Sequence, residues 1–407
     1  MRVTTAFNKM LGLVGASVDS VVFAPEGIVV GLRRRPHKHR CPCGGKTSGT
    51  RDHSVRRWRH LDLGGTRLFL EYRIARIDCP RCKATRTETV PWARPGARHT
   101  RDLQDLVAWL AQRTDKTTIT RLLRISWEAV AKIIVDVVAE AIDDKRLDGL
   151  YRIGVDEISY RKGHQYLTVV ADHDRDGAVV WAAKGKDHTV LEAFYDELGP
   201  KRVQKLSAVS LDMGGAYKLA TDNKAAHVTQ CVDPFHVIKL ANEAINKTRR
   251  VAWNVERDAG RPARKVKHTR WALVKDTQAL SRGQWETLDA LRRSRSALYR
   301  AWQLKEALRD LYRLRYPSQA PRHLDWWLAW ACRSRIPAFV SLAKTIRANR
   351  DRVLAAVELG LSNSKLEGLN SKIRLINHRG YGHHSAAALI GMIYLCAGGI
   401  TIDLPLR

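Results

Sequence analysis

The sequence lacks the features that mark membrane-spanning, secreted and disordered chains. Its longest apolar run, residues 386–400, is about fifteen residues long and contains glycine, which is too short for a helix that crosses a bilayer. The first residues offer no sustained apolar core leading to a small-residue cleavage site, as a signal peptide would. Long low-complexity tracts are also missing. We therefore expect a folded protein of the reducing cytoplasm.

Acidic residues are scarce relative to basic ones. The 407 residues include 41 Asp and Glu against 71 Lys and Arg, a formal net charge of +30 at pH 7. Positive charge in such excess repels itself in a compact chain, so it indicates a polyanionic partner, and nucleic acid is favoured over an anionic membrane surface. Hydrophobic residues make up 44%, enough for several packed domains.

Cysteines are few but unevenly placed. Four of the seven form two close pairs in Cys-Pro turns: Cys41, Cys43, Cys79 and Cys82. Two such turns can present four thiolates in a tetrahedron, so we predict a structural zinc site in a zinc-finger domain over 1–89. The first pair is one residue shorter than the usual spacing. Either both of its cysteines bind the metal, or His37 or His39 replaces one of them.

A second domain with helical periodicity follows a proline-rich linker, 91–96. Apolar residues at helical spacing predict three helices within 97–147. Ser126 is placed to cap the third helix after a short turn, which gives the length of a helix-turn-helix. Combined with the positive charge, this segment indicates a domain that binds double-stranded DNA, with Arg124 and Lys132 as candidate contacts.

The middle of the chain, 150–245, alternates strand and helix patterns. Strands over 153–158 and 164–171 are expected to form an antiparallel hairpin. Further elements follow in the order strand, helix, strand, short helix, strand, over 178–183, 188–198, 207–212, 217–222 and 228–233. This order is typical of a ribonuclease-H-like fold, in which the first and fourth strands are neighbours. Asp156 lies on the first of these strands and Asp212 on the fourth.

After the middle segment the chain changes character. Arg, Leu and Trp at helical spacing predict an all-helical insertion over 246–357, with its tryptophans mainly in the core. The segment 358–400 is expected to complete the core, and it opens with a helix that carries Glu367. The predicted fold class is therefore α/β multidomain, with a ribonuclease-H-like catalytic core interrupted by helices and preceded by a zinc finger and a helix-turn-helix.

Three carboxylates are candidates for a shared divalent-metal site. Gathered in one place, Asp156, Asp212 and Glu367 could hold two Mg²⁺ or Mn²⁺ ions and support phosphodiester chemistry. Glu157 is excluded because adjacent strand residues point to opposite faces. Asp233, which ends a strand, could support the site from outside the metal shell or add a further acidic group.

Several motifs carry a resemblance to a known family. They are Gly-Val-Asp-Glu at 154–157, Leu-Asp-Met-Gly at 211–214, Asp-Pro-Phe-His-Val-Ile-Lys at 233–239, and Ser-Asn-Ser-Lys-Leu-Glu-Gly-Leu-Asn-Ser-Lys-Ile-Arg at 362–374 with Arg-Gly-Tyr-Gly at 379–382. With the cysteine pairs and the helix-turn-helix, the chain resembles the ISL-three family of bacterial insertion-sequence transposases, which are of the DDE type. The shortened first cysteine pair is the main departure.

The resemblance implies an activity and its partners. A member of this family would bind the terminal repeats of its element as a homo-oligomer, cleave strands with divalent metal, and join the freed 3′-hydroxyl to target DNA. Two other functions remain open on the same features. One is a nuclease of this fold that hydrolyses DNA without strand transfer, and the other is an inactive DNA-binding regulator.

Overall fold

The computed structural model describes residues 2–35, 38–161, 163–261, 264–294, 296–362, 364–380, 383 and 385–404. Within the helices, the side chains of residues 264, 265 and 364–367 fall outside this description. The chain divides into two compact units. The first comprises Met1–Asp143 with Ile376–Arg407, and the second comprises Asp144–Leu375.

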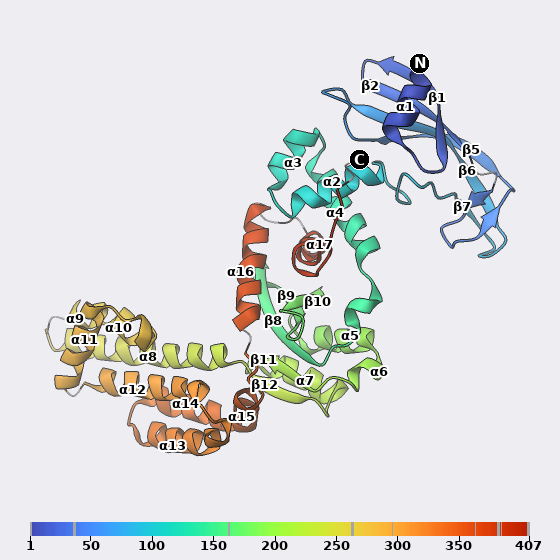
Figure 1. The fold of residues 1–407 in the computed structure, drawn as a ribbon. Coiled ribbons are helices and arrows are strands. Elements are labelled where there is room, and N and C mark those ends of the chain that lie inside the picture. Colours follow the sequence, from blue (N-terminus) through green and yellow to red (C-terminus); the bar gives the residue numbers. More distant parts are fainter. Residues whose placement is uncertain are drawn as a thin grey trace. The chain divides into compact units, whose positions relative to one another are not determined.

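The first unit begins with a small sheet behind a short helix (Figure 1). The elements are α1 (Val3–Leu11), β1 (Ala16–Ala24), β2 (Gly27–Arg34), β3 (His39–Arg40), β4 (Lys46–Thr47), β5 (Asp52–Arg59), β6 (Leu68–Cys79) and β7 (Ala84–Thr87). The main sheet has the order β1-β2-β6-β5, with β7 also paired to β6. β1 and β2 pair antiparallel as a hairpin. Trp58, Leu68 and Leu70 fill the core of this sheet.

Four helices complete the first unit: α2 (Arg101–Ala111), α3 (Lys116–Leu123), α4 (Trp127–Ala141) and α17 (Ala386–Ala397). Ser126 caps α4 as predicted, because its side-chain oxygen accepts from the N–H of Ala129 at 3.2 Å. Helix α17 packs on α4 at Gly391, where an added Cβ would lie 3.6 Å from Ile134. The stretch expected at 358–400 is thus divided between the two units.

The second unit is built on a five-stranded sheet: β8 (Arg152–Arg161), β9 (Gln165–Asp172), β10 (Ala178–Lys184), β11 (Ala208–Leu211) and β12 (Thr229–Val232). Its order is β10-β9-β8-β11-β12. β8, β9 and β10 are joined antiparallel, while β11 runs parallel to both β8 and β12. The first and fourth strands are therefore neighbours, as the ribonuclease-H-like order requires.

Different helices contact the two faces of this sheet. One face packs on α5 (His188–Leu198) and α7 (Gly215–Lys224), near the short α6 (Pro200–Val203), through Ile153, Val155, Val209, Leu211 and Tyr217. The other face meets α15 through Ala208, Cys231, Ala356 and Leu361. Because strand residues alternate in direction, Asp156, Asp212 and Asp233 belong to this second face.

The insertion is helical, as predicted. Its helices are α8 (Pro234–Asp258), α9 (Arg264–His268), α10 (Arg270–Val274), α11 (Arg282–Arg293), α12 (Ala297–Asp310), α13 (Ala320–Arg333), α14 (Pro337–Ala348) and α15 (Arg350–Glu358). They surround their own core, in which Trp327 is fully buried. Trp271, Trp285 and Trp326 are instead 56%, 44% and 52% exposed, so the prediction that tryptophans mainly pack inside holds for only part of the set.

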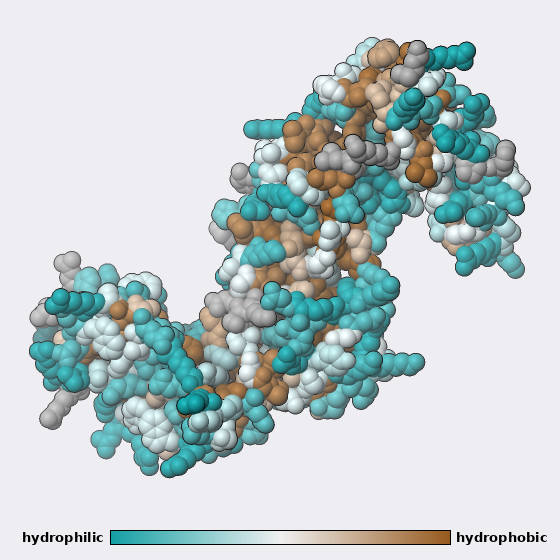
Figure 2. Space-filling view, viewed as in Figure 1, coloured by the Kyte–Doolittle hydropathy of each residue, from teal (hydrophilic) through white to brown (hydrophobic). Residues whose placement is uncertain are grey.

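Helix α16 (Ser364–Arg379) follows the insertion. Ile373 is fully buried on one side of it, and Leu375 is exposed on another. Among the described residues, no helix is both long enough and apolar enough to cross a membrane. In Figure 2, hydrophilic residues cover most of the visible surface of the insertion helices.

Candidate functional site

Three carboxylates line up across β8, β11 and β12, with Asp156 within β8 and Asp212 and Asp233 directly after β11 and β12. Gly154 pairs with Ser210, and Leu211 pairs with Val232, in parallel register. Continuing that register along the strands places Asp156, Asp212 and Asp233 in one row on one face of the sheet. Neighbouring strands are about 4.8 Å apart, so each residue of the row has the next one as its neighbour.

Asp156 is held in a polar setting. Its Oδ1 accepts from the backbone N–H of Glu157 at 2.8 Å, and its Oδ2 accepts from Nδ2 of Asn370 at 2.5 Å. The side chain is 13% exposed. Asn370 itself is buried and comes from α16, so this bond attaches α16 directly to the first strand of the sheet. Sequence reasoning placed Asn370 on this helix but did not identify its partner.

Asp212 lies just after β11 in a tight turn. Its Oδ1 accepts from the N–H of Gly214 at 2.8 Å. A Cβ at position 214 would lie 2.8 Å from the same oxygen, so only glycine leaves that carboxylate in place. Arg352 donates from Nη2 to the Asp212 carbonyl at 3.2 Å. Burial lowers the pKa of Arg352, and the nearby Asp212 charge opposes that shift.

Asp233 differs from the other two carboxylates because it is built into a helix terminus. It caps α8 by accepting from the N–H of Phe235 at 3.2 Å, and its side chain is 2% exposed. His236 lies between two members of the row, with Nε2 3.8 Å from Asp233 Oδ2 and 4.0 Å from Asp156 Oδ1. This position makes His236 a further polar group beside Asp156.

Glu157 belongs to the opposite face, beside α7. Its carboxylate is 3.9 Å from Lys186. Tyr217 of α7 bonds Thr168 at 2.8 Å, and burial raises the pKa of Tyr217, with smaller contributions from the negative charges of Glu157, Asp212 and Asp156. Tyr217 therefore lies close enough to three carboxylates to sense their charge.

Glu367 lies in the first part of α16, and its side chain is outside the described residues. Its backbone position is one helical turn before Asn370. Residues three apart on a helix share a face. The position of Glu367 therefore lies on the side of α16 whose next turn contacts Asp156.

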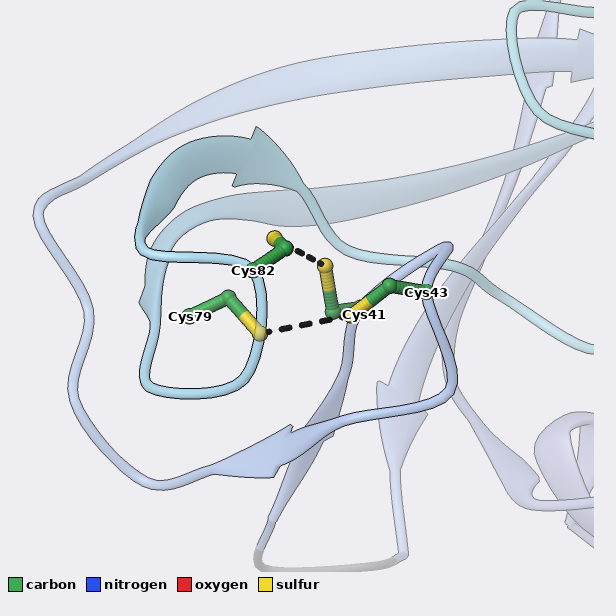
Figure 3. Close-up of side chains that lie close together, drawn as sticks. All are labelled: Cys41, Cys43, Cys79 and Cys82. Carbon is green, nitrogen blue, oxygen red and sulfur yellow. Dashed lines mark hydrogen bonds between the residues drawn. The ribbon is translucent and has the colours of Figure 1, made fainter.

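The four cysteines form a compact cluster (Figure 3). All four sulfur atoms lie within 4.8 Å of one another. Cys41 and Cys82 are 3.8 Å apart, and Cys43 and Cys79 are 3.5 Å apart. With a Zn–S distance near 2.3 Å, the edge of a tetrahedron is about 3.8 Å. Over the described ranges, no other group of three or more His, Cys, Asp or Glu is this close.

The short first turn accommodates both of its cysteines. Gly45 is essential here, since a Cβ at that position would lie 2.8 Å from the Cys79 sulfur. His39 Nδ1 is instead 2.7 Å from Glu88 Oε2, so His39 takes no part in the cluster. His37 lies outside the described residues. The sulfurs of both Cys41 and Cys43 point into the cluster.

The pKa values of the Cys79 and Cys41 thiols differ, because backbone hydrogen bonds act on one and burial on the other. Backbone N–H groups, first that of Cys82 and then that of Arg81, lower the pKa of Cys79 to about 6 despite some desolvation. Burial raises the pKa of Cys41 to about 12. A metal ion is the usual means by which such a set of thiols becomes thiolate together.

The sheet order, the carboxylate row and the cysteine cluster fit a transposase with a DDE-type catalytic domain. Models of known families agree with this class. A transposase model of the ISL3 family matches residues 153–393, the helix-turn-helix domain of transposase family ISL3 matches 88–138, and the zinc-finger of transposase IS204/IS1001/IS1096/IS1165 matches 37–82.

Two individual transposases that resemble this chain support the assignment to the ISL3 family. The chain is 38% identical to the transposase for insertion sequence element IS1557 of Mycobacterium tuberculosis, over 100% of this chain and 98% of that protein. It is 28% identical to the transposase for insertion sequence element IS1001 of Bordetella parapertussis, over 84% of each. This chain belongs to the ISL3 family of DDE transposases.

Proposed function

We propose that the protein binds the terminal inverted repeats of its insertion sequence and carries out metal-dependent strand cleavage and strand transfer into target DNA. The observation that carries this proposal is the row of Asp156 and Asp212 on neighbouring strands, with α16 attached to Asp156 through Asn370. Glu367 lies one helical turn before Asn370 on the same helix, which supports its inclusion in the proposed site. In this proposal, three separated segments would supply carboxylates to one metal site.

Asp156, Asp212 and Glu367 would hold Mg²⁺ or Mn²⁺. The donor set fits these ions, because it offers carboxylate oxygens and a further polar atom, the buried Oδ1 of Asn370, which has no hydrogen-bond partner among the described residues. Bound divalent cations would activate the attacking water or 3′-hydroxyl and stabilise the leaving oxygen. The residues of the chain orient this site: Gly214 holds Asp212, and Asn370 holds Asp156.

End recognition is assigned to the first unit. Four cysteines would hold a structural zinc ion, and α3 with α4 would present the helix-turn-helix to double-stranded DNA. Arg124 is a candidate DNA contact by sequence. It pairs with Asp62 and donates to the Gly65 carbonyl at 3.0 Å. These contacts hold the turn between α3 and α4 against the zinc-finger domain. Lys132 pairs only with Asp136 one turn along α4 among the described residues, is 72% exposed, and stays a candidate DNA contact.

The assembly and location follow from the same proposal. Cleaving and joining two ends of one element requires protein at both ends, which we propose is supplied by a homo-oligomer on DNA in the bacterial cytoplasm. Sedimentation of the protein with and without terminal-repeat duplex measures this directly. A complex with a single copy per pair of ends would contradict it.

Strand transfer on terminal-repeat substrates tests the reaction. The amide variants Asp156→Asn, Asp212→Asn and Glu367→Gln retain size but remove the charge that would hold cations, so each should abolish cleavage and joining while leaving end binding nearly unchanged. Asp233→Asn should reduce activity less, because Asp233 is engaged in capping α8.

The assay also separates the competing functions. Hydrolysed ends with no joined product would indicate a nuclease of the same fold. Specific end binding without any strand cleavage, in wild-type protein supplied with Mg²⁺ or Mn²⁺, would indicate a regulator. Near-normal cleavage by any one amide variant would remove that residue from the assignment.

A further inference from the structure

The helical insertion carries a large share of the positive charge. Residues 246–357 contain 26 Lys and Arg and 9 Asp and Glu, so their net charge is 26 − 9 = +17, out of +30 for the chain. Charge of one sign at this density destabilises a compact domain unless it meets an opposite charge. The question is which of these side chains are already neutralised within the insertion.

Many of the insertion's arginines have carboxylate partners. Arg292 and Arg293 both bond Asp289, and Arg282 is 3.2 Å from Glu286. Arg309 and Arg313 share Asp276. These guanidinium groups have their counter-charge within the insertion, although several are well exposed.

Three other arginines form a group without such partners. Arg249 and Arg250 lie on α8, and Arg270 begins α10, which packs on α8. Throughout the described ranges, no carboxylate lies within ion-pair distance of any of the three. Burial first, and then repulsion from Arg270 and Arg250, lowers the pKa of Arg249. Within the described part of the chain, the buried Nε of Arg249 has no hydrogen-bond partner.

An exposed aromatic ring accompanies this group. Trp271 is 56% exposed, and the guanidinium of Arg270 lies over its ring, 5.0 Å from the centroid. A large apolar ring left in water beside unpaired cations is not accounted for by packing within the insertion. Guanidinium forks bind phosphate oxygens well, and an exposed ring beside them adds a flat contact surface.

We propose that Arg249, Arg250 and Arg270, with Trp271, form a phosphate-binding surface for the target DNA duplex. Guanidinium contacts to phosphates position a duplex without reading its sequence. Such a surface suits target DNA, whose sequence varies from one insertion to the next, better than terminal repeats, which the zinc ribbon and helix-turn-helix are placed to recognise. The assignment to target DNA rests on the proposed transposition reaction, but duplex binding at this surface does not.

The test compares two triple variants of the full-length protein. One combines Arg249→Gln, Arg250→Gln and Arg270→Gln. The matched control combines Arg282→Gln, Arg292→Gln and Arg293→Gln, which removes three charges from the same insertion at arginines that already have carboxylate partners. Affinity for a duplex without terminal repeats is measured by fluorescence anisotropy at several salt concentrations.

The first variant should weaken binding and reduce the steepness of the log–log salt dependence by about 0.9 for each lost phosphate contact, so by about 2 to 3 in all. The control should reduce it by less than about 1. A third variant, with lysine at positions 249, 250 and 270, keeps the charge and should retain most of the salt dependence. Equal slopes for the first variant and the control, or a lysine variant as weak as the glutamine variant, would overturn the proposal.

A second measurement tests whether the duplex bound at this surface is target DNA or an element end. In strand-transfer reactions the first variant should cleave element ends at the wild-type rate but join them to target at least tenfold more slowly. The variant could instead bind terminal repeats less well while each bound end is joined to target at the wild-type rate. That result would mean that the surface binds the element ends, and the proposal of target DNA would be wrong. Wild-type protein without cleavage activity would contradict the transposition reaction, while the anisotropy result would still decide whether the surface binds duplex.

Discussion

The contact between Asn370 and Asp156 provides a sharp test of how the catalytic site is held together. Removing the amide in Asn370→Ala leaves the Asp156 carboxylate with the Glu157 N–H as its remaining donor in the structure. The lost bond is short, at 2.5 Å, and has a charged acceptor on a side chain that is 13% exposed. Hydrogen bonds to charged groups contribute about 1.5–3 kcal/mol.

At about 1.4 kcal/mol per factor of ten, this loss corresponds to a fall in cleavage rate of about 10- to 150-fold. The Mg²⁺ concentration for half-maximal cleavage should also rise, because a loosely held Asp156 binds the ion less well. The assay is cleavage of a terminal-repeat duplex across a Mg²⁺ titration. Ser371→Ala, on an exposed position of the same helix, is the control and should behave as wild type.

The Mg²⁺ titration distinguishes positioning from general damage to the fold. A variant that merely unfolds in part would lose rate without a change in half-saturating Mg²⁺, and its melting temperature would fall. If Asn370→Ala cleaves within threefold of wild type, with the same Mg²⁺ dependence, then the contact has no role in the site. The attachment of α16 to the sheet would then have to come from other residues.

Three further predictions concern stability and metal content. Cys79→Ser or Cys82→Ser should lose the zinc that we expect metal analysis to find at one ion per chain, and should weaken terminal-repeat binding while the second unit resists proteolysis. The hydrogen bond from the Arg101 side chain holds the pKa of Glu140 below its usual value. Above pH 4.5, the wild-type protein should therefore be more stable than Glu140→Gln by about 1 kcal/mol, after allowance for screening. This difference should vanish as pH falls through the lowered pKa, because protonation removes the charge that the folded state stabilises. Lys305→Met should destabilise the insertion by about 3 kcal/mol, because the buried ammonium donates to the Leu273 and Lys275 carbonyls and pairs with Glu306. Thermal unfolding measures the stability changes of the Glu140 and Lys305 variants.

Local patterns were enough to predict the strand order of the catalytic core. Alternation in β8 and β9, the amphipathic helix at 188–198 and the strand that precedes Asp212 all depend on residues close together in the chain. Hydrophobic periodicity reports such elements because it reflects which side faces the core. The strand order in turn makes β8 and β11 neighbours, so the pairing of Asp156 with Asp212 could also be predicted.

Contacts between distant segments were not predictable in the same way. Asn370 and Asp156 are 214 positions apart, and nothing in the local pattern of either residue identifies the other. His236 and Arg352 are likewise polar residues on helices whose roles depend on what those helices pack against. The sequence marked Arg124 as a candidate DNA contact, whereas its partner Asp62 is found in a separate domain of the same unit.

The burial of individual tryptophans in the insertion was also not predictable from local patterns. Leu and Trp at helical spacing indicated helices, but the spacing does not say how wide the buried face of each helix is. Trp327 is fully buried and donates to the Leu304 carbonyl at 2.7 Å, while Trp271 is 56% exposed. Only the arrangement of the neighbouring helices distinguishes them, because both residues are tryptophans at helical spacing.

By itself, the sequence determined the class of protein, the order of its domains, the strands that bear Asp156 and Asp212, and the two cysteine pairs. The class follows from the resemblance of these motifs to a known family, whereas the strands and the cysteine pairs follow from short-range periodicity and spacing. The tertiary structure decided that Cys41 and Cys43 both join the cluster, that Asn370 attaches α16 to the sheet, and which arginines of the insertion have no carboxylate partner. Each of these depends on groups brought together from distant parts of the chain, and a linear pattern carries no record of which distant groups meet.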